Sequence, residues 1–348
     1  MRVVVFGATG NIGTAIIRSL ADDPGIDSIT GVARRTPDWK PDKTSWAQAD
    51  IAHDDLGHIV SGADAVIHAA WAFHPSHHPT ATWETNVEGS IRVFDAVRDA
   101  EVPVLLYSSS VGAYSERVSL EPVAEDWPTH GWPTAAYTRE KAYLERVLDV
   151  VERDQPQLRI VRMRPGFVFQ RAAATEQRRI FVGPFLPAWL VRPGLIPAVP
   201  ELDGLVLQIV HAADVAEAFR LALHQPVRGA FNLAAAPTLN PADLAELFEA
   251  RTFSLPRPVA RHTIAALWHA HLVAAPPQLF DALLHLPVMD TTRARTELGW
   301  TPHHGAVETM QEFLDGLRDG AGDSTAPLAP NGVRARLREF AGGVGARG

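Results

Sequence analysis

A tyrosine and a lysine four residues apart, Tyr137 and Lys141, lie in a stretch with helical patterning. Side chains at this spacing project from one face of a helix, so the ammonium of Lys141 can lie near the phenol. An unperturbed tyrosine has a pKa of about 10 and is a poor base at neutral pH. A neighbouring positive charge favours the phenolate and lowers that pKa, so Tyr137 can exchange a proton with a substrate hydroxyl or carbonyl.

Three consecutive serines, Ser108 to Ser110, end an apolar segment whose residue pattern is typical of a buried strand. Open α/β sheets bind their ligands at the carboxyl ends of their strands. A hydroxyl placed there can donate a hydrogen bond to a substrate oxygen and polarise it. A plain polar turn is the competing interpretation.

A glycine-rich turn, Gly7 to Gly13, separates the first apolar run from the first helical pattern. Gly7 permits a tight turn, Gly10 lets the backbone approach a pyrophosphate, and Gly13 allows close packing of helix on strand. The phosphates would meet the unpaired N–H groups and the positive end of the helix. The strand–turn–helix context therefore predicts a dinucleotide site, against the alternative of a glycine-rich turn that binds nothing.

The strands and helices that position these groups are predicted by alternating apolar runs and helical patterns. The apolar runs predict strands at 3–6, 28–33, 45–50, 65–70, 104–109 and 159–164. The helical patterns cover 12–21, 80–100 and 135–154. Right-handed crossovers then give an α/β fold, a Rossmann-type doubly wound parallel sheet with a smaller C-terminal substrate-binding region.

Beyond Pro165 the chain is rich in proline, which keeps regular elements short. We expect a strand at 205–210, a helix at 213–224, a strand at 230–234 and a helix-rich stretch at 241–286. The expected units are a dinucleotide-binding Rossmann domain at 1–166 with a contribution from 205–235, a mainly substrate-binding region at 167–316, and a tail at 317–348. Because the tail is rich in glycine, alanine and proline, we expect it to pack loosely.

The composition excludes several kinds of protein. The 348 residues carry a net charge of −8, which argues against a nucleic-acid partner because that partner requires a basic face. There is no cysteine, which removes disulfides, thiolate nucleophiles and Cys-ligated metals. No run of about 18 apolar residues occurs and the chain opens directly into a strand, so we expect no membrane anchor, no signal peptide and a cytoplasmic location.

The choice of cofactor depends on the end of the second predicted strand. An NAD site places an Asp or Glu there, about 20 residues after the glycine turn, to bind the ribose 2′-hydroxyl. The strand ends instead in Arg34 and Arg35, and Asp27 precedes it. Two guanidiniums suit a 2′-phosphate, so NADP(H) is favoured while NAD(H) stays open. A solvated basic loop is the alternative.

The glycine turn, the serine segment and the Tyr–Lys pair together resemble the extended branch of the short-chain dehydrogenase/reductase superfamily, the NAD-dependent epimerase/dehydratase family. The resemblance covers roughly residues 1–316. It implies a catalytic triad of Ser110, Tyr137 and Lys141, with Ser109 as the fallback for the serine. It also implies that Lys141 bonds the nicotinamide ribose.

The resemblance also implies how the cofactor is held. Asp50 would accept from the adenine amino group, Ile51 would pack on the adenine ring, and Asn86 would brace the central strands. The segment from Arg164 to Val168 would cap the nicotinamide. The residues expected to bind the dinucleotide are Gly7, Thr9, Gly10, Asn11, Ile12, Gly13, Arg34, Arg35, Asp50, Ile51, Ala69, Ala70, Asn86, Ser108, Tyr137, Lys141, Pro165 and Val168.

Members of this family use one site for reduction, epimerisation and dehydration. The two residues after Ser110 carry no carboxylate, which disfavours the dehydration performed by sugar-nucleotide 4,6-dehydratases. Arg34 and Arg35 stand where epimerases that hold NAD carry an acid. We therefore predict an NADPH-dependent reductase of a ketone or secondary alcohol, with Tyr137 as acid/base. An NAD-dependent sugar-nucleotide epimerase is the alternative, and a non-catalytic NAD(P)-binding sensor is the second alternative.

The substrate region leaves two classes open. Aromatic residues are frequent at 167–189, and Trp71 and Phe73 follow the fourth predicted strand. Such residues suit a hydrophobic or ring-bearing ketone, and they suit a protein core equally well. Arg178 and Arg179 would suit the phosphate of a sugar nucleotide, unless they are solvated.

The expected partners are a small-molecule substrate and a second copy of the chain, paired through the helices at 80–100 and 135–154. No metal site is expected, because the histidines lack the carboxylate pattern of known zinc sites. These histidines form two groups, His74, His77 and His78, and His262, His269 and His271.

Overall fold

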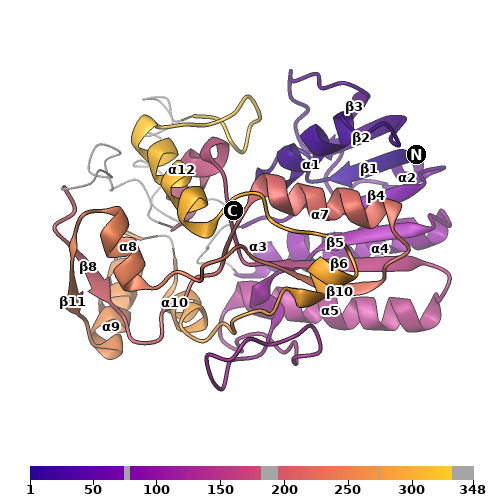
Figure 1. The fold of residues 1–348 in the computed structure, drawn as a ribbon. Coiled ribbons are helices and arrows are strands. Elements are labelled where there is room, and N and C mark those ends of the chain that lie inside the picture. Colours follow the sequence, from indigo (N-terminus) through magenta and orange to yellow (C-terminus); the bar gives the residue numbers. More distant parts are fainter. Residues whose placement is uncertain (74–78, 182–194, 274, 331–348) are drawn as a thin grey trace.

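A computed structural model describes residues 1–73, 79–181, 195–273 and 275–330 of the chain. Figure 1 shows a large sheet with helices on both faces and, to one side, a smaller region that contains α8, α9, α10, β8 and β11. No helix within the described ranges is long and apolar enough to cross a membrane.

The large sheet has seven strands, in the order β10-β6-β5-β4-β1-β2-β3. Every neighbouring pair is parallel, and the strand order changes direction between β1 and β4. The strands are β1 (Arg2–Phe6), β2 (Ser28–Ala33), β3 (Thr44–Gln48), β4 (Ala65–His68), β5 (Val104–Ser108), β6 (Arg159–Pro165) and β10 (Gly229–Leu233). The predicted doubly wound α/β fold is confirmed.

Side-chain alternation along β1 divides the core between the two faces of the sheet. Val3 and Val5 pack with α1 (Asn11–Ala21) and α7 (Ala212–His224) on one face. Val4 and Phe6 pack on the other face, with α4 (Gly89–Asp99) and α5 (Ala136–Asp154). A strand buried on both sides reads as a continuous apolar run, which explains the Val-Val-Val-Phe sequence.

The segment expected as one helix at 80–100 is divided into three. It consists of α3 (Pro79–Trp83), a π-helical turn η1 (Glu84–Glu88) and α4. The other short elements that precede the small region are α2 (Gly57–Val60) and the 3₁₀ turns η2 (Val111–Ala113) and η3 (Arg171–Ala173).

The remaining chain forms two small parallel ribbons and six helices among the described residues. The first ribbon pairs β7 (Phe167–Phe169) with β9 (Ile209–His211), and the second pairs β8 (Ala198–Glu201) with β11 (Arg251–Ser254). The helices are α6 (Ala174–Phe181), α8 (Pro241–Leu247), α9 (Arg257–His269), α10 (Pro277–Leu283), α11 (Thr292–Thr296) and α12 (Ala306–Asp319).

Two expectations for the C-terminal half were wrong in detail. The strand expected at 205–210 begins only at Ile209, because Leu207 forms an isolated antiparallel bridge with Leu239 instead. The tail is not loose over its described part, since Thr325 and Leu328 are fully buried. Residues 331–348 lie outside the described ranges, and the three domain boundaries stay a prediction.

Candidate active site

The glycine turn has the tight geometry that its sequence predicts. Gly7 has a φ of +78°, and a Cβ there would lie 2.5 Å from the Cα of Ala70. A Cβ on Gly13 would lie 2.0 Å from the carbonyl oxygen of Gly7. At Gly10 the nearest atom to such a Cβ is that same oxygen, 3.5 Å away. Gly7 and Gly13 thus allow close packing within the protein, whereas Gly10 leaves its outer side open.

That open side suits a dinucleotide. Gly10 is the N-cap of α1 and makes no side-chain capping bond to it. The first turn of the helix therefore presents backbone N–H groups and the positive end of its dipole without a protein side chain in front. Gly10 and Asn11 both line a cavity of about 520 Å³. The residues of the turn fit the pyrophosphate of a nicotinamide dinucleotide.

The same cavity reaches the predicted catalytic residues. The predicted site residues that line it are Gly10, Asn11, Ile12, Gly13, Ala69, Ser108, Ser110, Tyr137, Lys141, Pro165 and Val168. Apart from Val168 of β7, they come from the carboxyl ends of β1, β4, β5 and β6 and from α1 and α5, as expected for an open parallel sheet.

Ser110 and Tyr137 lie side by side in the lining of the cavity. The Tyr137 hydroxyl donates to Ser110 Oγ at 2.8 Å, and the backbone N–H of Gly112 donates to the same oxygen at 3.0 Å. A Cβ on Gly112 would lie 2.8 Å from the Tyr137 ring, so only glycine leaves room for the phenol. With both lone pairs of its oxygen engaged, Ser110 keeps its own O–H to donate to a substrate.

Ser109 is engaged elsewhere. Its hydroxyl donates to Glu145 Oε1 at 2.6 Å, and both groups are buried. The geometry thus brings Ser110, rather than the fallback Ser109, to Tyr137. The catalytic assignment itself stays a prediction.

Lys141 is held under an indole ring. Its Nζ donates to the carbonyl oxygen of Ser108 at 2.8 Å, lies 3.4 Å from the Tyr107 hydroxyl, and lies 3.5 Å from the centre of the Trp71 ring. Burial lowers the pKa of Lys141 to about 7, against the opposing charges of Glu140 and Glu145.

The pKa of Tyr137 is raised, whereas the sequence predicted that Lys141 would lower it. Burial raises that pKa to about 12, although the hydrogen bond with Ser110 lowers it in part. The rings of Trp71 and Phe73 lie edge-on at centroid distances of 5.7 and 4.8 Å from Tyr137. These rings cover part of the phenol, and Lys141 directs its ammonium to Ser108 rather than to Tyr137.

Asn86 holds the segment after β4 against α5. Its Oδ1 accepts from the N–H of Ala72 at 2.8 Å, and its Nδ2 donates to the Ala72 carbonyl oxygen at 3.1 Å and to Glu140 at 2.8 Å. These partners lie after β4 and on α5 rather than on the central strands that Asn86 was expected to brace. Its contact with a cofactor stays a prediction.

The residues predicted to hold the adenine half lie at the ends of β2 and β3. Arg34 and Arg35 are exposed directly after β2. Asp50 Oδ1 accepts from the N–H of Ala52 at 3.0 Å, and Ile51 is buried in the core cluster that contains α4. Thr9, another predicted cofactor residue, is buried within the glycine turn. None of these is among the described residues that line the cavity, and their roles stay predictions.

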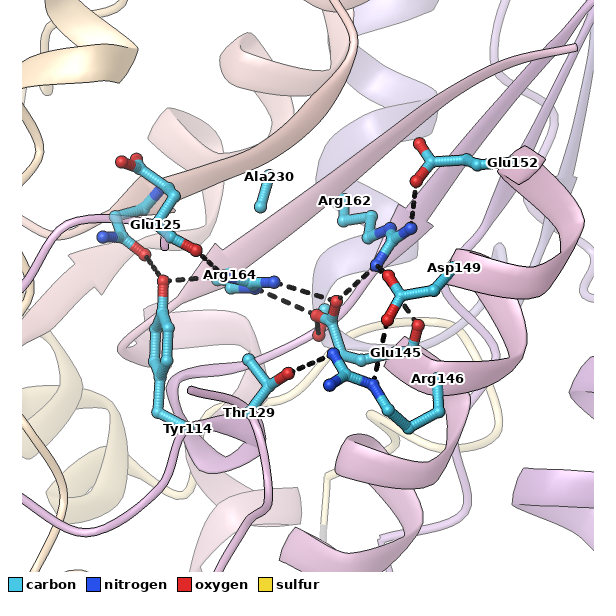
Figure 2. A network of polar contacts seen from close by, with 12 residues as sticks. Tyr114, Glu125, Thr129, Glu145, Arg146, Asp149, Glu152, Arg162, Arg164 and Ala230 are labelled. Atoms are coloured by element: carbon cyan, nitrogen blue, oxygen red, sulfur yellow. Dashed lines mark hydrogen bonds and ion pairs between the residues drawn. The ribbon is translucent and has the colours of Figure 1, made fainter. Parts of the chain in front are cut away.

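A buried ion-pair network beside the site was not predicted (Figure 2). Glu145, two turns after Tyr137 on α5, accepts from both Nε and Nη2 of Arg164 at 2.9 Å and from Arg162 at 3.0 Å. Arg164 also donates to the Tyr114 hydroxyl at 2.9 Å. The spacing of Tyr137, Lys141 and Glu145 by four residues was the available signal, because it places all three on one helical face.

Comparisons with known proteins agree with this geometry. A model of the NAD dependent epimerase/dehydratase family matches residues 3–234. The chain belongs to this family. The resemblance inferred from the residues is therefore confirmed, and with it a relation to enzymes that are dependent on NAD.

Relatives extend the epimerase/dehydratase likeness over most of the chain. A UDP-glucose 4-epimerase of Corynebacterium glutamicum is 23% identical, over 93% of this chain and 97% of its own. An uncharacterized protein of Mycobacterium tuberculosis is 25% identical, over 90% of this chain and 83% of its own. The crystal structure of a Stenotrophomonas maltophila UDP-glucose-4-epimerase with NAD and formylated UDP-arabinopyranose has a TM-score of 0.69 and 22% identity, over 92% of this chain and 98% of that one.

The histidines form no metal site in the part of the chain that the structure describes. No cluster of His, Asp or Glu there could hold a metal ion. His262 lies on exposed α9, with Nδ1 bonded to the Pro258 carbonyl oxygen at 2.6 Å. His74, His77 and His78 lie outside the described residues.

Proposed function

We propose that the protein is an NAD(P)-dependent oxidoreductase that interconverts a ketone and a secondary alcohol, with Tyr137 as the acid/base. The observation that carries the proposal is the 2.8 Å hydrogen bond between Tyr137 and Ser110, in the cavity that also contains the open side of the glycine turn. The Tyr137 hydroxyl and the glycine turn therefore border one cavity, which supports a reaction between a bound dinucleotide and a substrate at Tyr137.

The side chains divide the work in this mechanism. Ser110 orients the substrate oxygen with its free O–H, and Tyr137 gives that oxygen a proton. A bound nicotinamide supplies the hydride. Because burial raises the pKa of Tyr137 to about 12, the phenol is protonated at neutral pH and acts as an acid, which is the direction of reduction. Lys141 lies on the same helical face and would bond the nicotinamide ribose of a bound cofactor.

NADP(H) is the proposed cofactor. Its support is the pair of exposed guanidiniums at Arg34 and Arg35, placed directly after β2 where an NAD site carries a carboxylate. The family as a whole is dependent on NAD, so this preference belongs to this chain's own residues.

Sugar-nucleotide epimerisation is the second candidate function. The names of relatives favour it, since the Corynebacterium glutamicum protein and several structures of similar fold are UDP-sugar 4-epimerases. The same Tyr137 and Ser110 would serve that reaction. Tightly held NAD in the purified protein, released only on denaturation, would favour the epimerase over the reductase.

Replacement of Tyr137 by Phe tests the acid/base assignment. We expect Tyr137→Phe to lose about 100-fold or more in kcat, because the variant has no proton to give. Its dinucleotide affinity should match that of the wild type. Tyr143→Phe is the matched control, since Tyr143 lies on the same helix with 45% of its surface exposed. Full turnover by Tyr137→Phe would reject the proposal.

A further inference from the structure

We propose that the substrate is an apolar ketone or alcohol without phosphate groups, and that Glu176 excludes anions from its pocket. This inference rests on the proposed function for the identity of the reacting group. The binding of such a compound stands apart from its turnover, and the experiments below separate the two.

An apolar wall closes the cavity beyond Tyr137. Its side chains come from α9, α10 and the residues directly after α10, and all are partly exposed within the cavity. They are Ile264, Leu279, Phe280, Leu283 and Leu286. An apolar substrate would cover these side chains and remove them from water.

The apolar wall packs against α5, the helix that carries Tyr137, and against neighbouring segments. α10 packs against α5. Trp132, before α5, stacks on His285 with ring centroids 4.4 Å apart. The Arg117 guanidinium donates to the Leu286 carbonyl oxygen at 3.1 Å. The wall is therefore part of the site rather than a separate surface.

Few of the described residues bring a charge to this cavity. Among the described lining residues, Lys141 and Glu176 are the charged ones, and Trp71 covers the Lys141 ammonium. Arg178 and Arg179, which the sequence offered as phosphate ligands, do not line it. Arg179 donates to the Pro327 carbonyl oxygen at 2.7 Å. Burial raises the pKa of Glu176 to about 7, against the charge of Arg179. Above that pH, the pyrophosphate of a substrate on the apolar wall would meet a carboxylate in apolar surroundings, which is unfavourable.

Glu176 presents its carboxyl group to the substrate, next to Gln177. Glu176 lies in the first turn of α6, and no hydrogen bond to its carboxylate is formed within the described residues. Gln177 donates through Nε2 to the Val168 carbonyl oxygen at 2.7 Å, and its buried Oε1 has no partner there. The Glu176 carboxylate is an acceptor, which favours a substrate that carries a hydroxyl or amino donor beside its apolar body.

Calorimetric titration of the purified full-length chain tests the substrate class. The protein is titrated once saturated with NADP+ and once saturated with NAD+, so that ketones bind without reduction. The probes are decalone, a bicyclic ketone, and UDP-glucose. We expect heat of binding from decalone and none from UDP-glucose. Binding of UDP-glucose, with or without decalone, overturns the inference, and so does the absence of any decalone binding.

Paired variants on α9 test the apolar wall. Ile264→Lys places a charge in the cavity and should weaken decalone binding by about tenfold or more. Val259→Lys is the control, because Val259 lies on the same helix, is 51% exposed and does not line the cavity. Equal melting temperatures verify that both variants fold. Unchanged decalone binding in a folded Ile264→Lys overturns the assignment of the wall.

Glu176→Gln tests the exclusion of anions with little change in shape. The probes are two cyclohexanones, one with a tert-butyl group and one with a carboxylate. We expect the variant to bind the carboxylate about tenfold more tightly than the wild type does, with the neutral ketone unchanged. Glu246→Gln, on the exposed side of α8, should change neither affinity. An unaltered preference between the two ketones overturns the role of Glu176. If decalone binds but NADPH does not reduce it, the pocket assignment holds and the proposed function fails.

Discussion

The amino group of Lys141 lies between the carbonyl oxygen of Ser108 and the ring of Trp71, and 4% of the residue is exposed. Burial lowers its pKa from 10.5 to about 7, although Glu140 and Glu145 oppose the shift. Between these two values the unfolded chain binds a proton that the folded chain does not bind. The free energy of unfolding therefore rises with pH in this window and is level below it.

We expect the wild type to gain stability over Lys141→Met as the pH rises from about 7 to about 10, by about 1.4 kcal/mol per pH unit. The comparison with Met cancels the titration of groups that both proteins share. Urea unfolding of the two proteins at several pH values measures the difference. Parallel pH profiles would contradict the burial of this amine.

The two arginines after β2 carry the prediction on cofactor choice. The double variant Arg34→Ala, Arg35→Ala should bind NADPH at least about tenfold more weakly, because it loses charge-assisted hydrogen bonds to a 2′-phosphate. Its NADH affinity should stay unchanged. Lys40→Ala is the control, since Lys40 is another exposed cation of the same loop. Equal losses for NADPH and NADH would exclude recognition of the 2′-phosphate.

At the scale of elements, α5 joins the catalytic residues to the core. Tyr137, Lys141 and Glu145 lie on successive turns of one face, and Glu145 pairs with Arg162 and Arg164 of β6 (Figure 2). Burial alone would raise the pKa of Glu145, but the two arginines and Ser109 hold it at about 2. Ser109 precedes Ser110, so this network relates the position of the serine to that of the helix.

Glu145→Gln should lower the free energy of unfolding by about 3–5 kcal/mol, because it leaves two buried guanidiniums without their shared carboxylate. Asp154→Asn, which removes an exposed ion pair with Arg153 at the end of the same helix, should leave the denaturation midpoint unchanged. Equal midpoints for Glu145→Gln and the wild type would show that the network contributes no stability.

The sequence patterns predicted the secondary-structure elements better than they predicted the contacts between side chains. The strands of the large sheet lie within about two residues of the predicted ranges, since a strand buried on both faces is visible as an apolar run. The distinction between Ser109 and Ser110 needed Glu145, 36 residues from Ser109. Likewise, helical patterning at 241–286 did not indicate that Ile264 and Phe280 would line the same cavity as Tyr137. Side-chain partners this far apart in the chain leave no local pattern.

At the scale of the whole molecule, α5 leaves apolar surface uncovered. Tyr143 and Val150 expose 45% and 46% of their surface, and the ring of Trp83, at the end of α3, lies 5.1 Å from that of Tyr143. Exposed apolar groups gathered in this way are typical of interfaces. They lie on the helices through which the family resemblance implies a homodimer.

We expect light scattering to give the mass of a dimer for the wild type and of a monomer for Tyr143→Lys, Val150→Lys, because two charges cannot be buried in the interface without cost. Leu120→Lys is the control, since Leu120 is 59% exposed and lies outside α5. A monomeric wild type at micromolar concentration would reject the dimer.

The described end of the chain returns to the glycine turn. Thr325 donates to the carbonyl oxygen of Thr9 at 2.8 Å, across 316 residues, and Asp323 pairs with Arg18 of α1. During synthesis, this hydrogen bond to Thr9 cannot form until 316 further residues have been added. That takes tens of seconds at about 5–20 residues per second. The glycines of the turn allow it to form early, but the buried Thr325 that supports it is added late. A ribosome-bound chain stalled before Thr325 would hold a nucleotide turn that still lacks this support.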